Sequence, residues 1–130
     1  MPERRRLPDE RQSLTHKFTI RFQNELGKPD EVDIYAHVGF YEDGTPGELF
    51  LKSSKMGSAV SGFMEALATS VSLGLQYGVP LEKYVSKMKG MRFEPAGMTG
   101  DSDAPIAVSI PDIVARWLER KFLTPKEPAP

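Results

Sequence analysis

Hydrophobic residues recur at every second position along the first half of the chain, which is the period of a half-buried strand. In a first stretch, KFTIRF, apolar and polar residues alternate, and a second alternation follows at 32–40. A third apolar run, ELFLK, comes after the turn residues DGTPG, in which glycine accepts a positive φ and proline presets φ for a turn. The pattern predicts a three-stranded antiparallel meander over about residues 16–54.

The period then lengthens to three and four residues, which indicates helices. The first helix is predicted at about 58–77, with Ser58 as its N-cap and Gly78 in the left-handed position that ends it. The second helix, at about 80–89, has Pro80 at its first position, where the missing amide proton costs nothing.

The third helix is predicted at about 109–123 and has the clearest start. The Ser109 hydroxyl can accept the Asp112 amide, and the Asp112 carboxylate can turn back to the Ser109 amide, as in a capping box. Between the last two helices, residues 90–108 carry two prolines and three glycines. They predict a long loop, and loops of that length in a small domain are often functional.

These elements predict an α+β fold in two layers, because a half-buried sheet must cover its apolar face and packed helices can do so. The predicted domain spans residues 14–123. Residues 1–13 are expected to form a flexible, arginine-containing arm, since two prolines interrupt regular structure there. Residues 124–130, TPKEPAP, are expected to form a proline-rich tail.

The composition is that of a globular domain, with 39% hydrophobic and 27% charged residues. A length of 130 residues suits one domain and not two. We expect no membrane span, because no apolar run approaches the roughly 18–20 residues that a span needs. The N-terminus also lacks the apolar segment of a signal peptide. A cytoplasmic location is therefore predicted.

The chain contains no cysteine, which excludes disulfides, thiol nucleophiles, thiyl radicals and thiolate metal sites. Its two histidines, His16 and His37, do not make a zinc site by themselves, so no metal is predicted. A net charge of −1 argues against a protein that coats nucleic acid. A nucleophile, a base and an oxyanion site cannot be assembled from these residues, so residue chemistry alone indicates a binding domain.

The candidate binding residues are cations, a histidine, and small residues beside a helix start. They are Arg4, Arg5, Arg6, His16, Lys17, Lys55, Gly57, Ser58 and Arg92. The segment KMGS, residues 55–58, is a candidate anion site, because amides at a helix N-terminus point at anions and glycine lets a ligand approach. A plain turn between a strand and a helix explains the same segment equally well. Acidic neighbours favour a solvated linker for the arginine triplet, and Arg92 can simply pair with Glu94.

Five ordered blocks resemble one known region. They are RRRLPDERQSLTHKFTI, FYEDGTPGELFLKSSKMGS, LQYGVPLEKYV, MRFEPAGMTGD and SIPDIVARWL, and they cover nearly all of residues 4–123. The set resembles the C-terminal TSCPD domain of adenosylcobalamin-dependent, class II ribonucleotide reductases, which is named for a Thr-Ser-Cys-Pro-Asp stretch. Ser109, Pro111 and Asp112 match that motif, and Ile110 stands where its cysteine would be.

The resemblance implies a non-catalytic accessory module associated with deoxyribonucleotide synthesis, with a reductase catalytic chain as partner. The family's activity is ribonucleotide reduction, but the catalytic barrel that uses adenosylcobalamin is missing from this chain. We therefore predict no bound cofactor and no reductase activity for the chain by itself. Met1 and the proline-rich ending favour a stand-alone gene product over an excised piece of a longer reductase.

The alternative function is an independent protein that uses the same fold to bind a small ligand, a nucleotide or single-stranded nucleic acid. Aromatic and basic side chains on a sheet can stack bases and neutralise phosphates. The candidates on the predicted sheet face are Lys17, Arg21, Tyr35 and His37. A homodimer is also expected, because the apolar content is high for so small a sheet.

Overall fold

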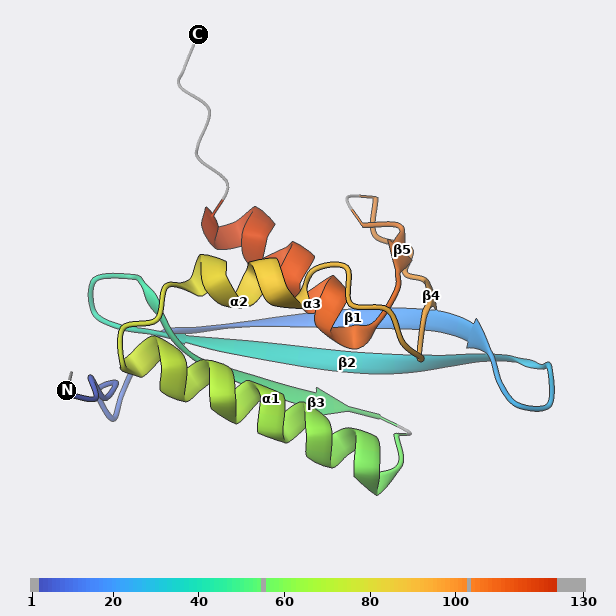
Figure 1. Ribbon diagram of the computed structural model, residues 1–130, viewed down its shortest axis with the longest axis horizontal. Coiled ribbons are helices and arrows are strands. Elements are labelled where there is room, and N and C mark those ends of the chain that lie inside the picture. The colour runs from blue at the N-terminus through green and yellow to red at the C-terminus, as the bar shows by residue number, and fades with distance from the viewer. Residues whose placement is uncertain (1–2, 55, 103, 124–130) are drawn as a thin grey trace, which may run out of the picture.

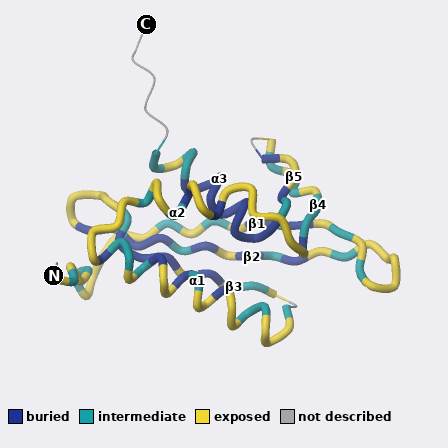
Figure 2. The backbone as a smooth tube through the Cα atoms, viewed as in Figure 1, coloured by how far each residue is buried: buried dark blue, intermediate teal, exposed yellow. Residues whose placement is uncertain are grey.

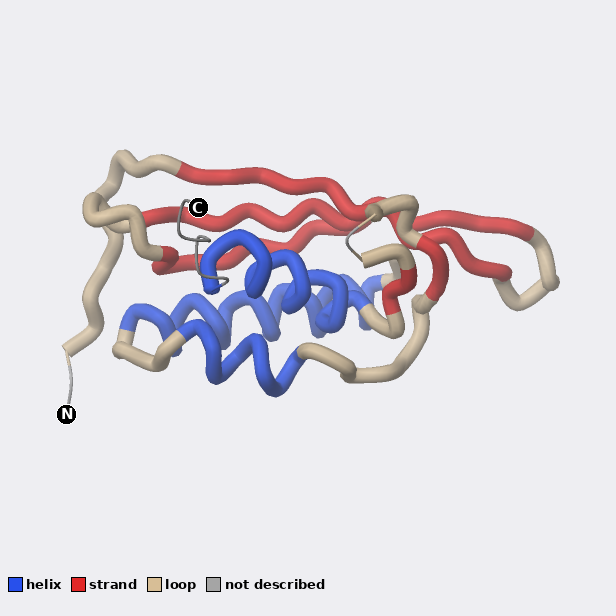
Figure 3. The backbone as a smooth tube through the Cα atoms, turned by 90° about the horizontal axis from the view of Figure 1, so that it is seen from above, coloured by secondary structure: helices blue, strands red, loops and turns tan. Residues whose placement is uncertain are grey.

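The computed structural model of the chain describes residues 3–54, 56–102 and 104–123. One antiparallel sheet forms a layer, and three helices lie on one of its faces, leaving the other face open (Figures 1 and 3). This arrangement confirms the α+β fold that the sequence predicts.

Three long strands form the predicted meander. They are β1 (Ser13–Gln23), β2 (Pro29–Phe40) and β3 (Pro46–Ser53), with β2 paired to both neighbours. The alternating positions set which side chains face the helices, because successive side chains of a strand point to opposite faces. Phe18, Ile20 and Ile34 accordingly lie in the core at 0–3% exposure.

The sheet has five strands, where the sequence predicts three. β4 (Gly97–Met98) pairs with β1, and β5 (Ile106–Ala107) pairs with β4, which gives the order β3-β2-β1-β4-β5. Two-residue strands are too short to leave a period in the sequence, so 90–108 resembles a plain loop. A side chain at Gly97 would overlap the Arg21 carbonyl, so glycine permits the close pairing that covers the β1 edge.

The helices lie close to their predicted positions. They are α1 (Ser58–Gln76), α2 (Leu81–Met88) and α3 (Ile110–Leu118), and a π-helical turn η1 (Glu119–Leu123) continues α3. α1 packs along β3, and α2 packs against α3. The N-cap of α1 is Gly57 and not the predicted Ser58, which is the first helical residue. Gly78 follows the C-cap with φ of 92°, as predicted.

The core fills the space between the sheet and the helices, and the buried segments of α3 and the central strands meet there (Figure 2). Its largest member is Trp117, which is 1% exposed. Phe18 meets the indole edge-on at 5.7 Å between ring centroids, and Phe122 does so at 6.0 Å. Edge-to-face pairs of this kind add specific geometry to area burial.

α1 departs from one expectation of the sequence analysis. An 18-residue window of Ser58–Gln76 has a mean hydropathy of 1.2, so by length and composition alone the helix could cross a membrane. The core helix of a globular protein passes the same test, and α1 packs on β3. Only 17% of that window is buried, however, so packing on the sheet accounts for only part of its apolar surface.

Candidate functional site

The SIPD segment at the start of α3 forms a buried clasp. The Ser109 hydroxyl accepts the Asp112 amide at 3.0 Å, as predicted for an N-cap. The sequence predicts that the Asp112 carboxylate accepts a hydrogen bond from the Ser109 amide. In the structure it accepts hydrogen bonds from the Gly90 amide at 2.7 Å and the Val108 amide at 3.2 Å instead. Arg116 also donates to it at 3.0 Å. Ser109 and Asp112 are 0% exposed, so these motif positions join neighbouring segments inside the fold.

The other two motif positions are also buried. Pro111 lies in the first turn of α3, and Ile110, where the motif has cysteine, is 2% exposed in the core. Both line an apolar pocket of about 420 Å³, together with Phe63 and Phe93. The site of the missing cysteine is therefore a packing position in this chain.

A polar pocket of about 500 Å³ opens beside the start of β1, between the β4–β5 turn and the end of α3. It brings the predicted residues His16 and Lys17 together with charged groups that sequence reasoning missed. The titratable side chains that line it are His16, Lys17, Asp101, Arg120 and Lys121. No motif marks Arg120 or Lys121, since only the tertiary fold returns the end of α3 to β1.

The His16 ring lies on the Trp117 indole, with 5.3 Å between ring centroids and planes 27° apart. Burial lowers the pKa of His16, the nearby Arg120 and Lys121 lower it further, and Asp101 opposes them. A lowered pKa favours the neutral ring, which can accept as well as donate a hydrogen bond.

The pocket carries charges of both signs. Arg120 contacts Asp101 at 3.3 Å, so one carboxylate lies among the cations. Thr19 and Thr99 also line the pocket, and their hydroxyls donate within the chain, to Asp33 at 2.8 Å and to the Ala104 carbonyl at 2.5 Å. This mixture suits a small polar ligand with an anionic group better than an extended polyanion.

The arginines of the predicted arm contact the body of the domain. We call residues 3–12 the N-terminal strap. Arg4 donates to the Gln76 side chain at 2.7 Å, and the Arg5 amide donates to the Gln76 carbonyl at 2.7 Å. The Arg5 guanidinium lies 3.8 Å from the centre of the Tyr41 ring, and Arg6 is exposed. The first two arginines thus serve contacts within the chain.

Arg11, which was not a candidate, makes the strongest contact of the strap. Its guanidinium meets both oxygens of Glu48, at 2.5 and 2.9 Å, and this hydrogen bonding raises the pKa of Arg11. Glu48 is buried at 8% exposure and lies over Gly39, where any side chain would overlap it. A bidentate arginine–carboxylate pair is geometrically specific, so it fixes the strap on the sheet.

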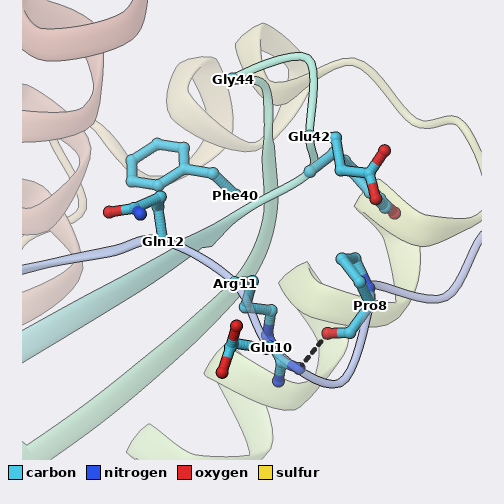
Figure 4. A pocket seen from close by; sticks show the side chains of 8 residues that line it. Pro8, Glu10, Arg11, Gln12, Phe40, Glu42 and Gly44 are labelled. Atoms are coloured by element: carbon cyan, nitrogen blue, oxygen red, sulfur yellow. Dashed lines mark hydrogen bonds between the residues drawn. The ribbon is translucent and has the colours of Figure 1, made fainter.

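The strap and the β2–β3 turn enclose a pocket of about 550 Å³. Figure 4 shows Phe40 and Gln12 on one side of it and Glu42 on the other, with Arg11 bonded to the Pro8 carbonyl. In the same turn, hydrogen bonds from Thr45, and a weaker one from Arg5, lower the pKa of Asp43 to about 2. The charges of Arg5, Arg11 and Asp43 are thus used in ion pairs and turn hydrogen bonds within the chain.

The remaining candidates are scattered. Lys55 lies outside the described residues, and Gly57 and Ser58 are exposed at the start of α1. Gly57 has φ of −64°, so its position does not require glycine. Arg92 is exposed on the segment between α2 and β4. The predicted site residues that the structure describes are therefore not gathered into one site.

The open face of the sheet carries the residues of the alternative function. Lys17, Tyr35 and Lys52 lie in one row across three strands, and the next row includes His37 and Phe50. Tyr35 is 37% exposed and Phe50 is 50% exposed. Acidic partners offset part of the positive charge, since Lys17 is 3.9 Å from Asp33.

Among the described residues, no group of three or more histidine, cysteine, aspartate or glutamate side chains is placed to hold a metal ion.

Comparison with known proteins identifies the family. The TSCPD domain model matches residues 3–122. The chain therefore belongs to the TSCPD family, as the sequence blocks predict, and its relatives place it with the TSCPD domains of vitamin B12-dependent, class II ribonucleotide reductases. No solved structure matches.

Three relatives illustrate the match, and each carries the name vitamin B12-dependent ribonucleotide reductase. That of Rhodopirellula baltica is 45% identical over 129 residues, which are 99% of this chain and 12% of the relative. That of Streptomyces avermitilis is 48% identical over 94% of this chain and 12% of the relative. That of Bradyrhizobium diazoefficiens is 38% identical over 95% and 9%. The chain thus spans about an eighth or less of these proteins.

Proposed function

We propose that this chain is a non-catalytic accessory module that associates with the catalytic part of a vitamin B12-dependent ribonucleotide reductase and serves deoxyribonucleotide synthesis. The proposal is supported by the extent of the match, because nearly the whole chain aligns with a small segment of much longer reductases. A segment retained beside a catalytic body is expected to have a surface that fits it.

The chemistry of the chain supports a non-catalytic role. Its 130 residues include no cysteine, so they supply no thiol from which a thiyl radical could form. The Ser-Pro-Asp positions of the motif are buried in a clasp, and the cationic candidates among the described residues are dispersed or paired. We place the chain in the cytoplasm with the reductase, and the adenosylcobalamin cofactor on the catalytic part.

The proposal is tested by tagging the chain, capturing it from its native cell extract and identifying bound proteins by mass spectrometry. A reductase catalytic chain is expected at a fixed stoichiometry in the native mass of the eluted complex. Two surface variants probe the predicted contacts. Arg6→Glu reverses an exposed charge on the strap, and Gly57→Trp adds a ring where the structure is open.

Lys87→Glu, on the exposed side of α2, is the matched control. At least one probe variant is expected to reduce reductase recovery tenfold, while the control retains it. Deletion of the strap is a poorer probe, because Arg11 and Glu48 contribute to the fold itself. Absence of the reductase from the captured material would overturn the proposal.

A second candidate function is binding of a nucleotide or a single-stranded nucleic acid on the open sheet face. The observation that favours it is the pair of exposed rings, Tyr35 and Phe50, on neighbouring strands with Lys17 and Lys52 beside them. Stacking on an exposed ring contributes about 1–3 kcal/mol per base.

Fluorescence anisotropy with labelled oligo-dT, and with labelled ATP, tests this candidate. Tyr35→Ala is expected to weaken binding by at least fivefold, and binding is expected to weaken as salt rises. Met98→Ala, another exposed apolar side chain of the sheet, is the control. No change in anisotropy at high micromolar protein would exclude this function.

A further inference from the structure

The side of α1 that faces away from β3 is apolar and exposed. We call it the outer stripe of α1, and it consists of Ala59, Phe63, Ala66, Ser70, Leu73 and the C-cap residue Tyr77. Phe63 is 77% exposed, Leu73 39% and Tyr77 45%. Figure 2 shows this outer side of α1 as largely exposed along its length.

The outer stripe has no counterpart on the other helices. α2 places its buried apolar residues on one side, toward the core, and every residue of α3 except Arg116 is buried, whereas α1 has apolar residues on its exposed side as well. Glu65 is the only charged residue of Ser58–Gln76, and it lies to the side of the stripe. A helix that is apolar all round is normally covered all round, so a second partner is expected beyond β3.

The spacing of the stripe suits a helix as that partner. Its members are separated alternately by four and three residues, which is the heptad repeat by which one helix packs along another. The central members, Ala66 and Ser70, are small. Small residues at the contact allow two helix axes to approach toward the short end of the usual 8–10 Å.

The stripe is also complementary to itself in the antiparallel direction. When two copies are aligned about a two-fold axis at the middle of the stripe, Ala59 lies opposite Tyr77 and Ala66 lies opposite Ser70. Phe63 then lies opposite Leu73. Each of these contacts occurs twice, once in each direction, as in an isologous interface, and the largest ring, Tyr77, lies opposite an alanine.

We propose that two copies of this chain form a dimer in which the outer stripes of their α1 helices pack antiparallel. The absence of charge from the stripe removes like-charge repulsion between identical surfaces. The antiparallel direction sets the positive end of each helix dipole beside the negative end of the other. This proposal does not depend on the association with a reductase.

The size of the stripe sets the expected strength of the dimer. Its exposed side chains amount to roughly 400 Å² per copy, if a fully exposed aromatic side chain contributes about 150–250 Å². That is about half of the roughly 800 Å² per partner of a standard interface. We therefore expect a reversible dimer whose dissociation constant lies in the micromolar range.

Sedimentation velocity from about 1 to 200 μM protein tests the proposal. The wild-type chain is expected to shift from monomer to dimer across this range. Ala66→Glu sets a charge on each copy near the two-fold axis and is expected to weaken dimerisation at least tenfold. Ser86→Glu adds the same charge at an exposed position of α2 and is expected to dimerise like the wild type. Circular dichroism checks that both variants keep the fold.

Cysteine cross-linking tests the register, because the chain has no cysteine of its own. An Ala59→Cys chain is mixed with a longer, tagged Tyr77→Cys chain under mild oxidation. The antiparallel register predicts a disulfide between the two different chains. Cross-linking of each variant only with itself would overturn the register.

Other occupants of the stripe give distinct results, each of which overturns the dimer. If the chain stays monomeric at 200 μM and its Ala66→Glu variant no longer captures the reductase, the stripe binds the catalytic part of the reductase. A monomeric chain that floats with phosphatidylcholine vesicles has a stripe that faces lipid. If the dimer forms and no reductase is captured, the dimer stands and the proposed function fails.

Discussion

Asp112 shows how one buried carboxylate can organise several segments. It accepts the amide of Gly90 after α2, the amide of Val108 after β5 and the guanidinium of Arg116. We expect Asp112→Ala to lower the free energy of unfolding by about 3–5 kcal/mol, because it leaves buried donors without an acceptor. Urea denaturation measures this loss.

Glu42→Gln removes an exposed carboxylate and is the control for that measurement. Its effect is expected to stay within about 0.5 kcal/mol. A similarly small loss for Asp112→Ala would show that water replaces the carboxylate and that the clasp is not structural.

His16 is expected to make stability depend on pH. Burial, followed by the charges of Arg120 and Lys121, lowers its pKa in the folded chain. Between the folded pKa and the unfolded value near 6.5, the unfolded state binds more protons, so stability falls as the pH falls below about 6.5. We expect less stability at pH 5.5 than at 7.5 by urea denaturation.

The substitution His16→Gln is expected to reduce that difference. His37→Gln, which retains His16, keeps the difference and serves as the comparison. If the two variants show the same pH dependence as each other, His16 is not its source.

At the scale of elements, the N-terminal strap joins the end of α1 to the β2–β3 turn. Arg11 and Glu48 form a largely buried pair, whereas Arg5 and Asp43 form an exposed one with side chains more than half exposed. Loss of Arg11 strands a buried carboxylate, but loss of Arg5 does not. We expect Arg11→Ala to cost about 2–4 kcal/mol of unfolding free energy and Arg5→Ala about 1 kcal/mol or less.

Thermal or urea denaturation of the Arg11→Ala and Arg5→Ala variants measures the two losses of unfolding free energy. Equal losses would mean that the strap contributes only weak surface contacts. Restoration of stability by a second change, Glu48→Gln in the Arg11→Ala background, would confirm that the stranded charge is the cause.

At the scale of the whole molecule, local stability is expected to decrease across the sheet. The three long strands lie under the helices, whereas β4 and β5 contribute two residues each at one edge. Amide hydrogen exchange is expected to be slowest for β1 and β2 and at least a hundredfold faster for Met98 and Ile106. Equal protection of β4 and β1 would mean that the short strands belong to the same cooperative unit.

The elements that the sequence predicts best are those with a strong period. Residues 32–40 alternate and α1 has helical spacing because each element buries one face. The buried positions then recur every two residues in a strand and every three or four in a helix. β4 and β5 could not be predicted because two residues define no period. The N-cap of α1 was misplaced by one residue because Ser58 is a better cap type than Gly57, while the backbone turns at Gly57.

The candidate site was predicted less well than the fold. His16 and Lys17 were placed at a strand start, and they do line a polar pocket. The residues that complete it, Arg120 and Lys121, are about a hundred positions away along the chain and carry no motif. The acidic neighbours of the strap arginines predict a solvated linker, and Arg5 and Arg6 are exposed, but Arg4 bonds to Gln76 and Arg5 also contacts the Tyr41 ring and Asp43.

The sequence by itself determined the α+β architecture, the TSCPD family and the exclusion of thiol chemistry. These depend on periodic burial, on ordered blocks of residues and on the absence of one residue type, all of which can be seen in a linear chain. Only the tertiary structure decided that Asp112 is a buried clasp, that the strap lies on the sheet and that one side of α1 is left uncovered. Those features depend on which distant segments meet, and contact between distant segments leaves no local pattern in the sequence.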